Sequence, residues 1–256
     1  MLLNYHEFGQ GRPIIILHGL FGSARNWQSI ARDLSCNYHV LTPDLRNHGL
    51  SPHAVTMSYQ DMSDDIIAFA DQLSLDNVII LGHSLGGKVA MTAALLHPKR
   101  FSALAVVDIA PVSYPQNFAE LITAVDALEL KSLKNRTQAE KALSKVIDDM
   151  SIIQLLLQNL VRSENGFRWR CNLEGIMANL SLIGQFPDSL KNNSYRLPSL
   201  FLGGAESNYL RNTHNISIYN HFPAAKINML RGAGHWPHIE KPKEFLKHLK
   251  NFINSV

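Results

Sequence analysis

Six short, largely apolar runs constrain the fold of this chain more than any other feature. They lie at residues 14–17, 38–41, 78–81, 103–107, 200–202 and 227–230. Apolar runs of this length, each followed by turn-forming or polar residues, are typical of buried strands in a parallel sheet. Because segments with helical periodicity separate several of the runs, the sequence predicts an α/β fold with a mostly parallel sheet flanked by helices.

Two segments between or after these runs carry helix signals. Residues 58–73 have apolar side chains at a 3.6-residue period, and Ser58 followed by Asp61 resembles a capping box. Pro242 suits the first position of a helix, and the residues after it form one apolar stripe. We expect a helix at each place.

The alternation stops between about residues 112 and 196. This stretch has a mostly helical pattern, in which Thr137 and Glu140 resemble another capping box, and we predict no strand within it. We therefore expect a helical cap, or lid, inserted at residues 112–196 over one end of the sheet. The core of the fold then comprises residues 1–111 and 197–256.

The composition is that of a globular protein. The 256 residues are 46% hydrophobic and 18% charged, which is enough for one well-buried core. The net charge is only +3 and the basic residues are scattered, so we expect no nucleic-acid partner. No apolar run approaches the ~18 residues of a membrane span.

Two cysteines, Cys36 and Cys171, are too few for a disulfide framework, so we expect free thiols. No signal peptide is recognised near the N-terminus. A cytoplasmic location is the resulting expectation, and the sequence does not predict the oligomeric state.

A nucleophile motif, Gly-His-Ser-Leu-Gly at residues 82–86, lies between a predicted strand and a predicted helix. The G-x-S-x-G pattern places a serine on a sharp strand-to-helix turn, so that its hydroxyl projects from the sheet. Gly82 and Gly86 remove side chains that would collide with the neighbouring backbone. A capping serine in a glycine-rich turn would look similar, but the flanking strand and helix favour Ser84 as a nucleophile.

Backbone amides that stabilise an oxyanion are expected beside this serine. The start of the following helix supplies the amide of Leu85. The loop after the first strong strand usually supplies the second donor, which we assign to Leu20, with Phe21 as the alternative. His18 precedes the serine in the chain, and we interpret it as structural.

The base should follow the nucleophile and the acid along the chain. Among twelve histidines, His235 fits best, because it lies just past the last predicted strand. The adjacent Gly234 allows a tight loop aimed at the carboxyl edge of the sheet, where α/β active sites lie. His238 is a weaker alternative.

Five segments carry a family resemblance. They are His-Gly-Leu-Phe-Gly-Ser at 18–23, Asp-Leu-Arg-Asn-His-Gly-Leu-Ser at 44–51, Gly-His-Ser-Leu-Gly-Gly-Lys at 82–88, Val-Asp-Ile-Ala-Pro-Val at 107–112 and Gly-Ala-Gly-His-Trp at 232–236. The chain resembles the α/β-hydrolase fold and, more narrowly, small bacterial esterases of the YbfF type and their mitochondrial relatives. The segment at 107–112 points to this subfamily, whereas the motif around Ser84 marks only the fold.

The acid of the triad has two candidates. The fold usually places it after the strand at 200–202, where this chain has Glu206 and then Ser207. Asp108 ends the preceding strand at the same edge of the sheet. The resemblance implies the acid role for Asp108, with Ser207 in support through a hydrogen bond, while Glu206 remains the alternative.

These residues predict acyl transfer to Ser84, with His235 as base and no metal or organic cofactor. The expected substrate is a small-molecule ester or thioester of a short- to medium-chain acyl group, selected by the cap. A carbon–carbon bond hydrolase or a lyase is the alternative on the same fold. A non-catalytic binding module is the alternative from another class, favoured only by the serine at 207.

Overall fold

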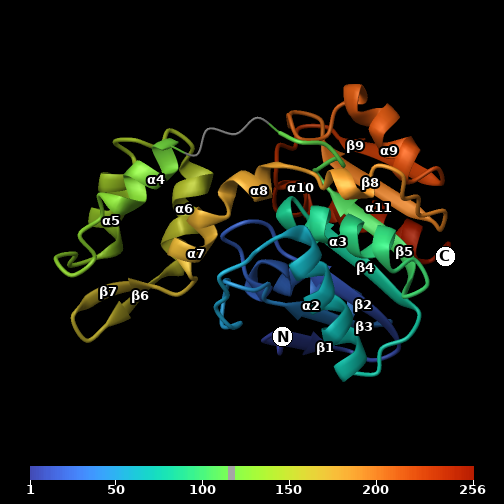
Figure 1. Cartoon of the computed structure of the whole chain (residues 1–256), viewed down its shortest axis with the longest axis horizontal. Helices are drawn as coiled ribbons and strands as arrows, with labels where there is room; N and C mark the ends of the chain where they lie inside the picture. Colours follow the sequence, from blue (N-terminus) through green and yellow to red (C-terminus); the bar gives the residue numbers. More distant parts are fainter. Residues whose placement is uncertain (115–118) are drawn as a thin grey trace.

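A seven-stranded sheet forms the centre of the computed structural model, which describes residues 1–114 and 119–256 (Figure 1). The strand order is β1-β3-β2-β4-β5-β8-β9; β1 pairs antiparallel with β3, and the other neighbours pair in parallel. The strands are β1 (Tyr5–Phe8), β2 (Arg12–Leu17), β3 (Tyr38–Pro43), β4 (Val78–His83), β5 (Phe101–Val107), β8 (Ser199–Gly204) and β9 (Ala225–Leu230). All six predicted runs lie in these strands, so the predicted mostly parallel sheet is confirmed.

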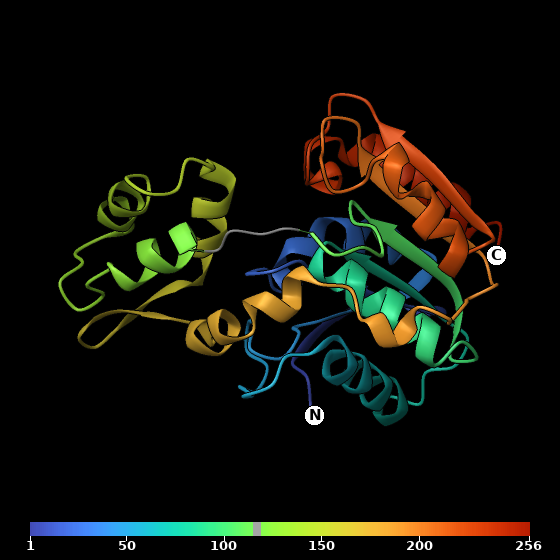
Figure 2. The ribbon, with the colours of Figure 1, turned by 45° about the horizontal axis from the view of Figure 1, so that its top comes forward.

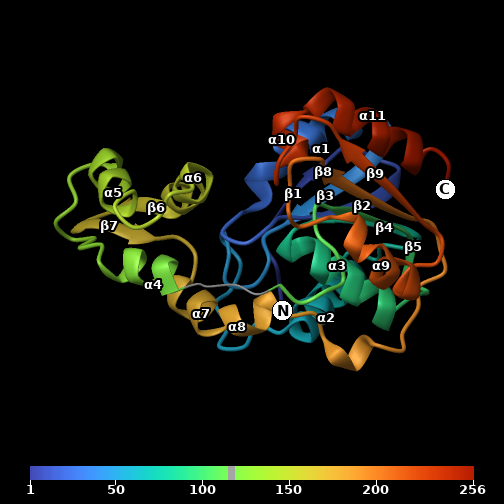
Figure 3. The same ribbon diagram turned by 90° about the horizontal axis from the view of Figure 1, so that it is seen from above.

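Helices cover both faces of the sheet (Figure 3). One face carries α2 (Tyr59–Gln72), α3 (Leu85–Leu96) and α9 (Asn215–His221), and the other carries α1 (Gln28–Leu34) and α11 (Pro242–Ile253). Successive side chains of a strand point to opposite faces of the sheet. Ile15 packs on the face of α2 and α3, and Ile14 packs on the face of α1 and α11. Inner strands are therefore apolar on both sides, which is why they read as continuous apolar runs.

Two of the predicted helix starts are confirmed. The Ser58 side chain accepts a hydrogen bond from the amide of Asp61, whose own side chain accepts from the amide of Ser58, so α2 begins with a capping box. Pro242 occupies the first turn of α11.

Outside residues 119–184, the described chain also has four short helices: η1 (Ala24–Trp27), η2 (Asp188–Leu190), η3 (Asn212–His214) and α10 (Pro237–Glu240).

An inserted segment, residues 119–184, extends to one side of the sheet (Figures 1 and 2). It contains α4 (Ala119–Asp126), α5 (Arg136–Leu143), α6 (Met150–Asn159), β6 (Leu160–Ser163), β7 (Gly166–Trp169), α7 (Leu173–Ala178) and α8 (Leu180–Gly184). Its mostly helical character agrees with the sequence pattern. The last helix, α8, leads the chain back to the sheet beside α3.

Two expectations for this stretch are wrong. Strands β6 and β7 form an antiparallel hairpin where we predicted no strand. Each has only four residues, with Leu160 and Phe167 as their well-buried apolar side chains, which is too few to show an alternating pattern. The capping residue of α5 is Asn135, which accepts from the amide of Gln138, rather than Thr137.

Cys36 is exposed and Cys171 is buried, and both are free, as predicted. Among the described helices, none combines the length and apolar character needed to cross a bilayer.

Candidate active site

Ser84 lies on a strained turn between β4 and α3. Its backbone has φ 50° and ψ −116°, a conformation that non-glycine residues rarely adopt. A Cβ at position 82 would collide with the carbonyl oxygen of Gly86, and a Cβ at position 86 would collide with the carbonyl oxygens of Leu17 and His18. The two glycines of the motif are therefore required by close backbone approach, as the sequence suggested.

His235 and Asp108 form a hydrogen-bonded pair beside this turn. The Nδ1 of His235 is 2.7 Å from Oδ2 of Asp108, and the carboxylate is fully buried. Asp108 follows β5, whereas His235 lies in the loop after β9, so the pair joins two segments that are distant in the sequence. With Nδ1 bonded to the acid, Nε2 of the ring is left to act on a proton.

Further donors hold the Asp108 carboxylate in place. The amide of Gly204 donates to Oδ1 at 3.0 Å, and the hydroxyl of Ser207 donates to Oδ2 at 2.5 Å. The Ser207 oxygen also accepts from the amide of Tyr209 at 3.1 Å. Glu206 is exposed, so the carboxylate that contacts His235 is that of Asp108.

The two predicted oxyanion donors, Leu85 and Leu20, line the same cavity as the serine. Leu85 is the first residue of α3, where an amide has no acceptor within the helix. The amide of Phe21 already donates to Nε2 of His48 at 3.1 Å. That hydrogen bond favours Leu20 over Phe21 as the second donor.

Two other histidines, His83 and His238, pack next to His235 but stay uncharged. Burial lowers the pKa of His238 to about 3, and its ring stacks on Trp27 with centroids 4.2 Å apart. Burial also lowers the pKa of His83 well below its ordinary value, and its Nε2 lies 2.8 Å from the carbonyl oxygen of His235. Both rings are neutral and packed, so they position the loop that carries His235.

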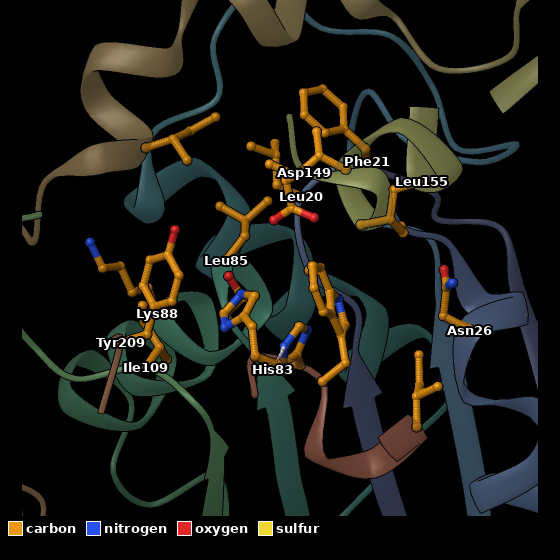
Figure 4. Close-up of a pocket in the computed structure, with 18 of the residues that line it drawn as sticks. Leu20, Phe21, Asn26, His83, Leu85, Lys88, Ile109, Asp149, Leu155 and Tyr209 are labelled. Carbon is orange, nitrogen blue, oxygen red and sulfur yellow. Dashed lines mark hydrogen bonds between the residues drawn. The ribbon is translucent and has the colours of Figure 1, made fainter. Parts of the chain in front are cut away.

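A cavity of about 580 Å³ joins these groups (Figure 4). Ser84 and His235 line it from the sheet side, and Leu20 and Leu85 line it next to the serine. The inserted segment supplies the opposite wall through Leu121, Ile147, Asp148, Asp149, Ile152, Leu155 and Ile183. Within the described parts of the chain, no three His, Cys, Asp or Glu side chains gather in a way that would hold a metal ion.

The polar turn at residues 44–51 supports the cavity from outside. Asn47 has φ 67°, a left-handed conformation that asparagine tolerates. Its backbone oxygen accepts from the amide of Asn172 at 2.9 Å, which ties the turn to the inserted segment. Arg46 donates to Asp65 at 2.6 Å and to the backbone oxygens of Thr56 and Asp61, which fits a bracing role.

The sequence as a whole also matches a known family. The sequence model described as "alpha/beta hydrolase fold" matches residues 12–242, which is most of the chain. The chain belongs to the α/β-hydrolase family.

Relatives of this α/β hydrolase carry names of ester-cleaving enzymes. A Xenopus tropicalis protein named sn-1-specific diacylglycerol lipase ABHD11 is 41% identical over 98% of this chain and 81% of that protein. Esterase YbfF of Escherichia coli is 33% identical over 95% of this chain and 93% of its own length. A solved structure titled "Marine microorganism esterase" superposes with a TM-score of 0.93 at 37% identity, covering 98% of each chain. These relatives support a hydrolase that acts on ester bonds, and the resemblance stated from the sequence is confirmed.

Several residues of this α/β hydrolase's cavity were not singled out from the sequence. Lys88, Tyr59 and Tyr114 line it together with Tyr209, whose ring lies 4.2 Å from that of His235. Lys88 follows the nucleophile by one helical turn and so shares the face of Ser84, but its burial, which sets it apart from other helix residues, is seen only in the structure.

Proposed function

We propose that this α/β hydrolase is a serine esterase that cleaves acyl esters through an acyl-Ser84 intermediate. The observation that carries the proposal is the buried Asp108–His235 pair, which opens into the same cavity as the serine on its strained turn. A carboxylate bonded to Nδ1 fixes the tautomer in which Nε2 accepts a proton.

In the first step, His235 takes the proton of the Ser84 hydroxyl while the oxygen attacks the ester carbonyl. Asp108 stabilises the imidazolium that forms, and Ser207 and Gly204 hold Asp108 in place. The amides of Leu85 and Leu20 stabilise the negative charge on the carbonyl oxygen. The imidazolium then gives its proton to the departing alcohol or thiol.

In the second step, His235 removes a proton from water, which attacks the acyl-serine. Collapse of the second tetrahedral intermediate releases the carboxylic acid and returns the proton to Ser84. Every group in this scheme belongs to residues 1–111 or 197–256, which we propose as the catalytic core, with residues 112–196 as its cap.

The proposed substrate is a small molecule, an ester or a thioester of a short- to medium-chain acyl group. A cavity of about 580 Å³, whose lining includes nine leucine and isoleucine residues, accommodates such a chain. We propose no nucleic-acid partner, and a cytoplasmic location, supported by the two free cysteines.

The decisive experiment compares wild type with Ser84→Ala on p-nitrophenyl esters of graded chain length and on the matching acyl-coenzyme A thioesters. We expect the variant to lose activity by about 10³-fold or more, because the nucleophile is absent. A fluorophosphonate should label the wild type and not the variant. Labelled, folded wild type that cleaves none of these esters or thioesters would contradict the proposal and favour carbon–carbon bond cleavage.

A further inference from the structure

Lys88 is a buried cation in the wall of the catalytic cavity. It is only 2% exposed and lies among the residues that line the cavity (Figure 4). Its backbone amide donates to the carbonyl oxygen of Ser84 at 3.0 Å, so it follows the nucleophile by one turn of α3. Lysine is almost never fully buried unless it is paired, so this position calls for a partner.

Backbone carbonyl oxygens accept hydrogen bonds from only two of the three donors of the Lys88 ammonium group. Its Nζ donates to the carbonyl oxygens of Gly184 at 3.1 Å and Gln185 at 2.6 Å, at the end of α8. An ammonium group has three donors, and the third has no acceptor among the described residues. The rings of Tyr59 and Tyr114 lie 5.6 and 5.0 Å from Nζ and present their faces to the charge.

The charge of Lys88 is not neutralised by the surrounding side chains. None of the ion pairs among the described residues includes it. Burial lowers its pKa to about 7, with no carboxylate opposing that effect. The hydroxyls of Tyr59 and Tyr114 donate instead to the carbonyl oxygens of Ile183 and Tyr209.

We propose that Lys88 binds a carboxylate or other anionic group of the substrate, remote from the carbonyl that Ser84 attacks. This inference rests on the proposed ester hydrolysis. An anionic group would supply both the missing acceptor and the missing opposite charge, whereas an alkyl chain would leave the buried cation without either. The part of the cavity next to Lys88 therefore favours acyl esters that carry a negative charge.

The first test compares charged and neutral esters on the wild type. The charged series is the mono-p-nitrophenyl esters of adipic, suberic and sebacic acids, and the neutral series is the p-nitrophenyl alkanoates of equal carbon number. We expect kcat/KM to favour the charged ester by about tenfold at one chain length, the value of one charge-assisted hydrogen bond. No preference at any length would overturn the proposal.

The second test asks whether Lys88 causes the preference. In Lys88→Met, which removes the charge and leaves an unbranched side chain one atom shorter, the ratio of kcat/KM for the two esters should fall to about 1. Lys99→Met removes a charge from an exposed position after the same helix and should keep the wild-type ratio. If Lys88 only anchors α8, both esters lose activity equally and the ratio is unchanged, which would refute the anion site.

The third test uses pH and needs no variant. The preference should be present at about pH 6 and disappear as the pH rises past 7, because the Lys88 ammonium loses its proton while the ester carboxylate stays ionised. Both esters react through the same catalytic groups, so the pH dependence of that shared chemistry cancels in the ratio. A ratio that stays constant from pH 6 to 9 would count against Lys88.

Five other titratable side chains around the cavity stay uncharged in that interval. Burial raises the pKa values of the tyrosines and lowers those of two histidines among them: Tyr59, Tyr114, Tyr209, His83 and His238. Asp148 and Asp149 also line the cavity, from the inserted segment. Failure of the proposed function itself would look different: either the wild type would cleave neither series, or Ser84→Ala would retain hydrolysis of the neutral esters.

Discussion

Three residues of the site have a positive φ that their side chains disfavour. Phe21 has φ 59°, Ser84 φ 50° and Asp108 φ 50°, and each follows the carboxyl end of a strand. Such conformations cost of order 1–3 kcal/mol each and are found mainly where function requires them. Here they turn the chain sharply at the sheet edge, so that Phe21 and Ser84 line one cavity and Asp108 lies behind it, bonded to His235.

Asp108→Asn should reduce kcat by about 10³- to 10⁴-fold, because an amide does not hold His235 in the required tautomer or stabilise its cation. Glu206→Gln is the matched control, since it removes the same charge from an exposed position in the neighbouring loop. Steady-state kinetics on a p-nitrophenyl ester, with a thermal melt for each variant, make the comparison. A larger loss in Glu206→Gln would assign the acid to Glu206 instead.

Single residues differ in how far the sequence identifies them. The motif around Ser84 and the loop around His235 can be recognised in the sequence, because their glycines imply tight turns at strand ends. The choice between Asp108 and Glu206 depends on where two loops from different strands point, which only the folded geometry reveals. Lys88 reads as an ordinary helix residue until its burial and its contacts with α8 are known.

Among the strands, burial determines which can be predicted from the sequence. The inner strands are apolar on both faces and are readily predicted. Strand β1 lies at the edge of the sheet, half-buried and polar, and gives no such signal. The hairpin of β6 and β7 is hidden for a similar reason, because its exposed arginines interrupt its short apolar pattern.

The strand-to-helix turn between β4 and α3 leaves no room for a methyl group at Gly86. Gly86→Ala should lower the free energy of unfolding by about 1–3 kcal/mol, since the added carbon meets backbone carbonyls of β2 that do not move aside. Urea denaturation measures the change. Gly234→Ala is the control, because its added carbon would lie at ordinary contact distance, 3.4 Å, from Glu240. Equal stability of the two variants would show that the turn tolerates a side chain.

For the molecule as a whole, buried neutral histidines couple stability to pH. Burial lowers the pKa of His48 and His238 to about 3, and also lowers the pKa of His18 and His83. In the unfolded chain the same rings take up protons near pH 6.5. Below that pH the unfolded state therefore binds more protons than the folded state, and stability falls as the pH falls.

Between about pH 6.5 and pH 3, His48 and His238 should each lower the free energy of unfolding by about 1 kcal/mol per pH unit. Urea denaturation at pH 7.5, 6.5 and 5.5 measures the slope. His238→Gln should reduce the slope by about 1 kcal/mol per pH unit, whereas His53→Gln, at an exposed position, should leave it unchanged. Stability that is independent of pH over this range would mean that the rings become charged in the folded protein.

The cavity is lined by two parts of the chain that differ in how well they tolerate mutation. The proposed reacting groups follow strands of the sheet, where a substitution disturbs a packed core. The facing wall of the cavity comes from α4, α6, α8 and the residues just before α6. Mutations in that wall reshape what enters without touching the proton-transfer pair. A lineage with this architecture is free to diversify its substrates while its chemistry stays fixed, and a library confined to the inserted segment is the natural starting point for redirecting the enzyme.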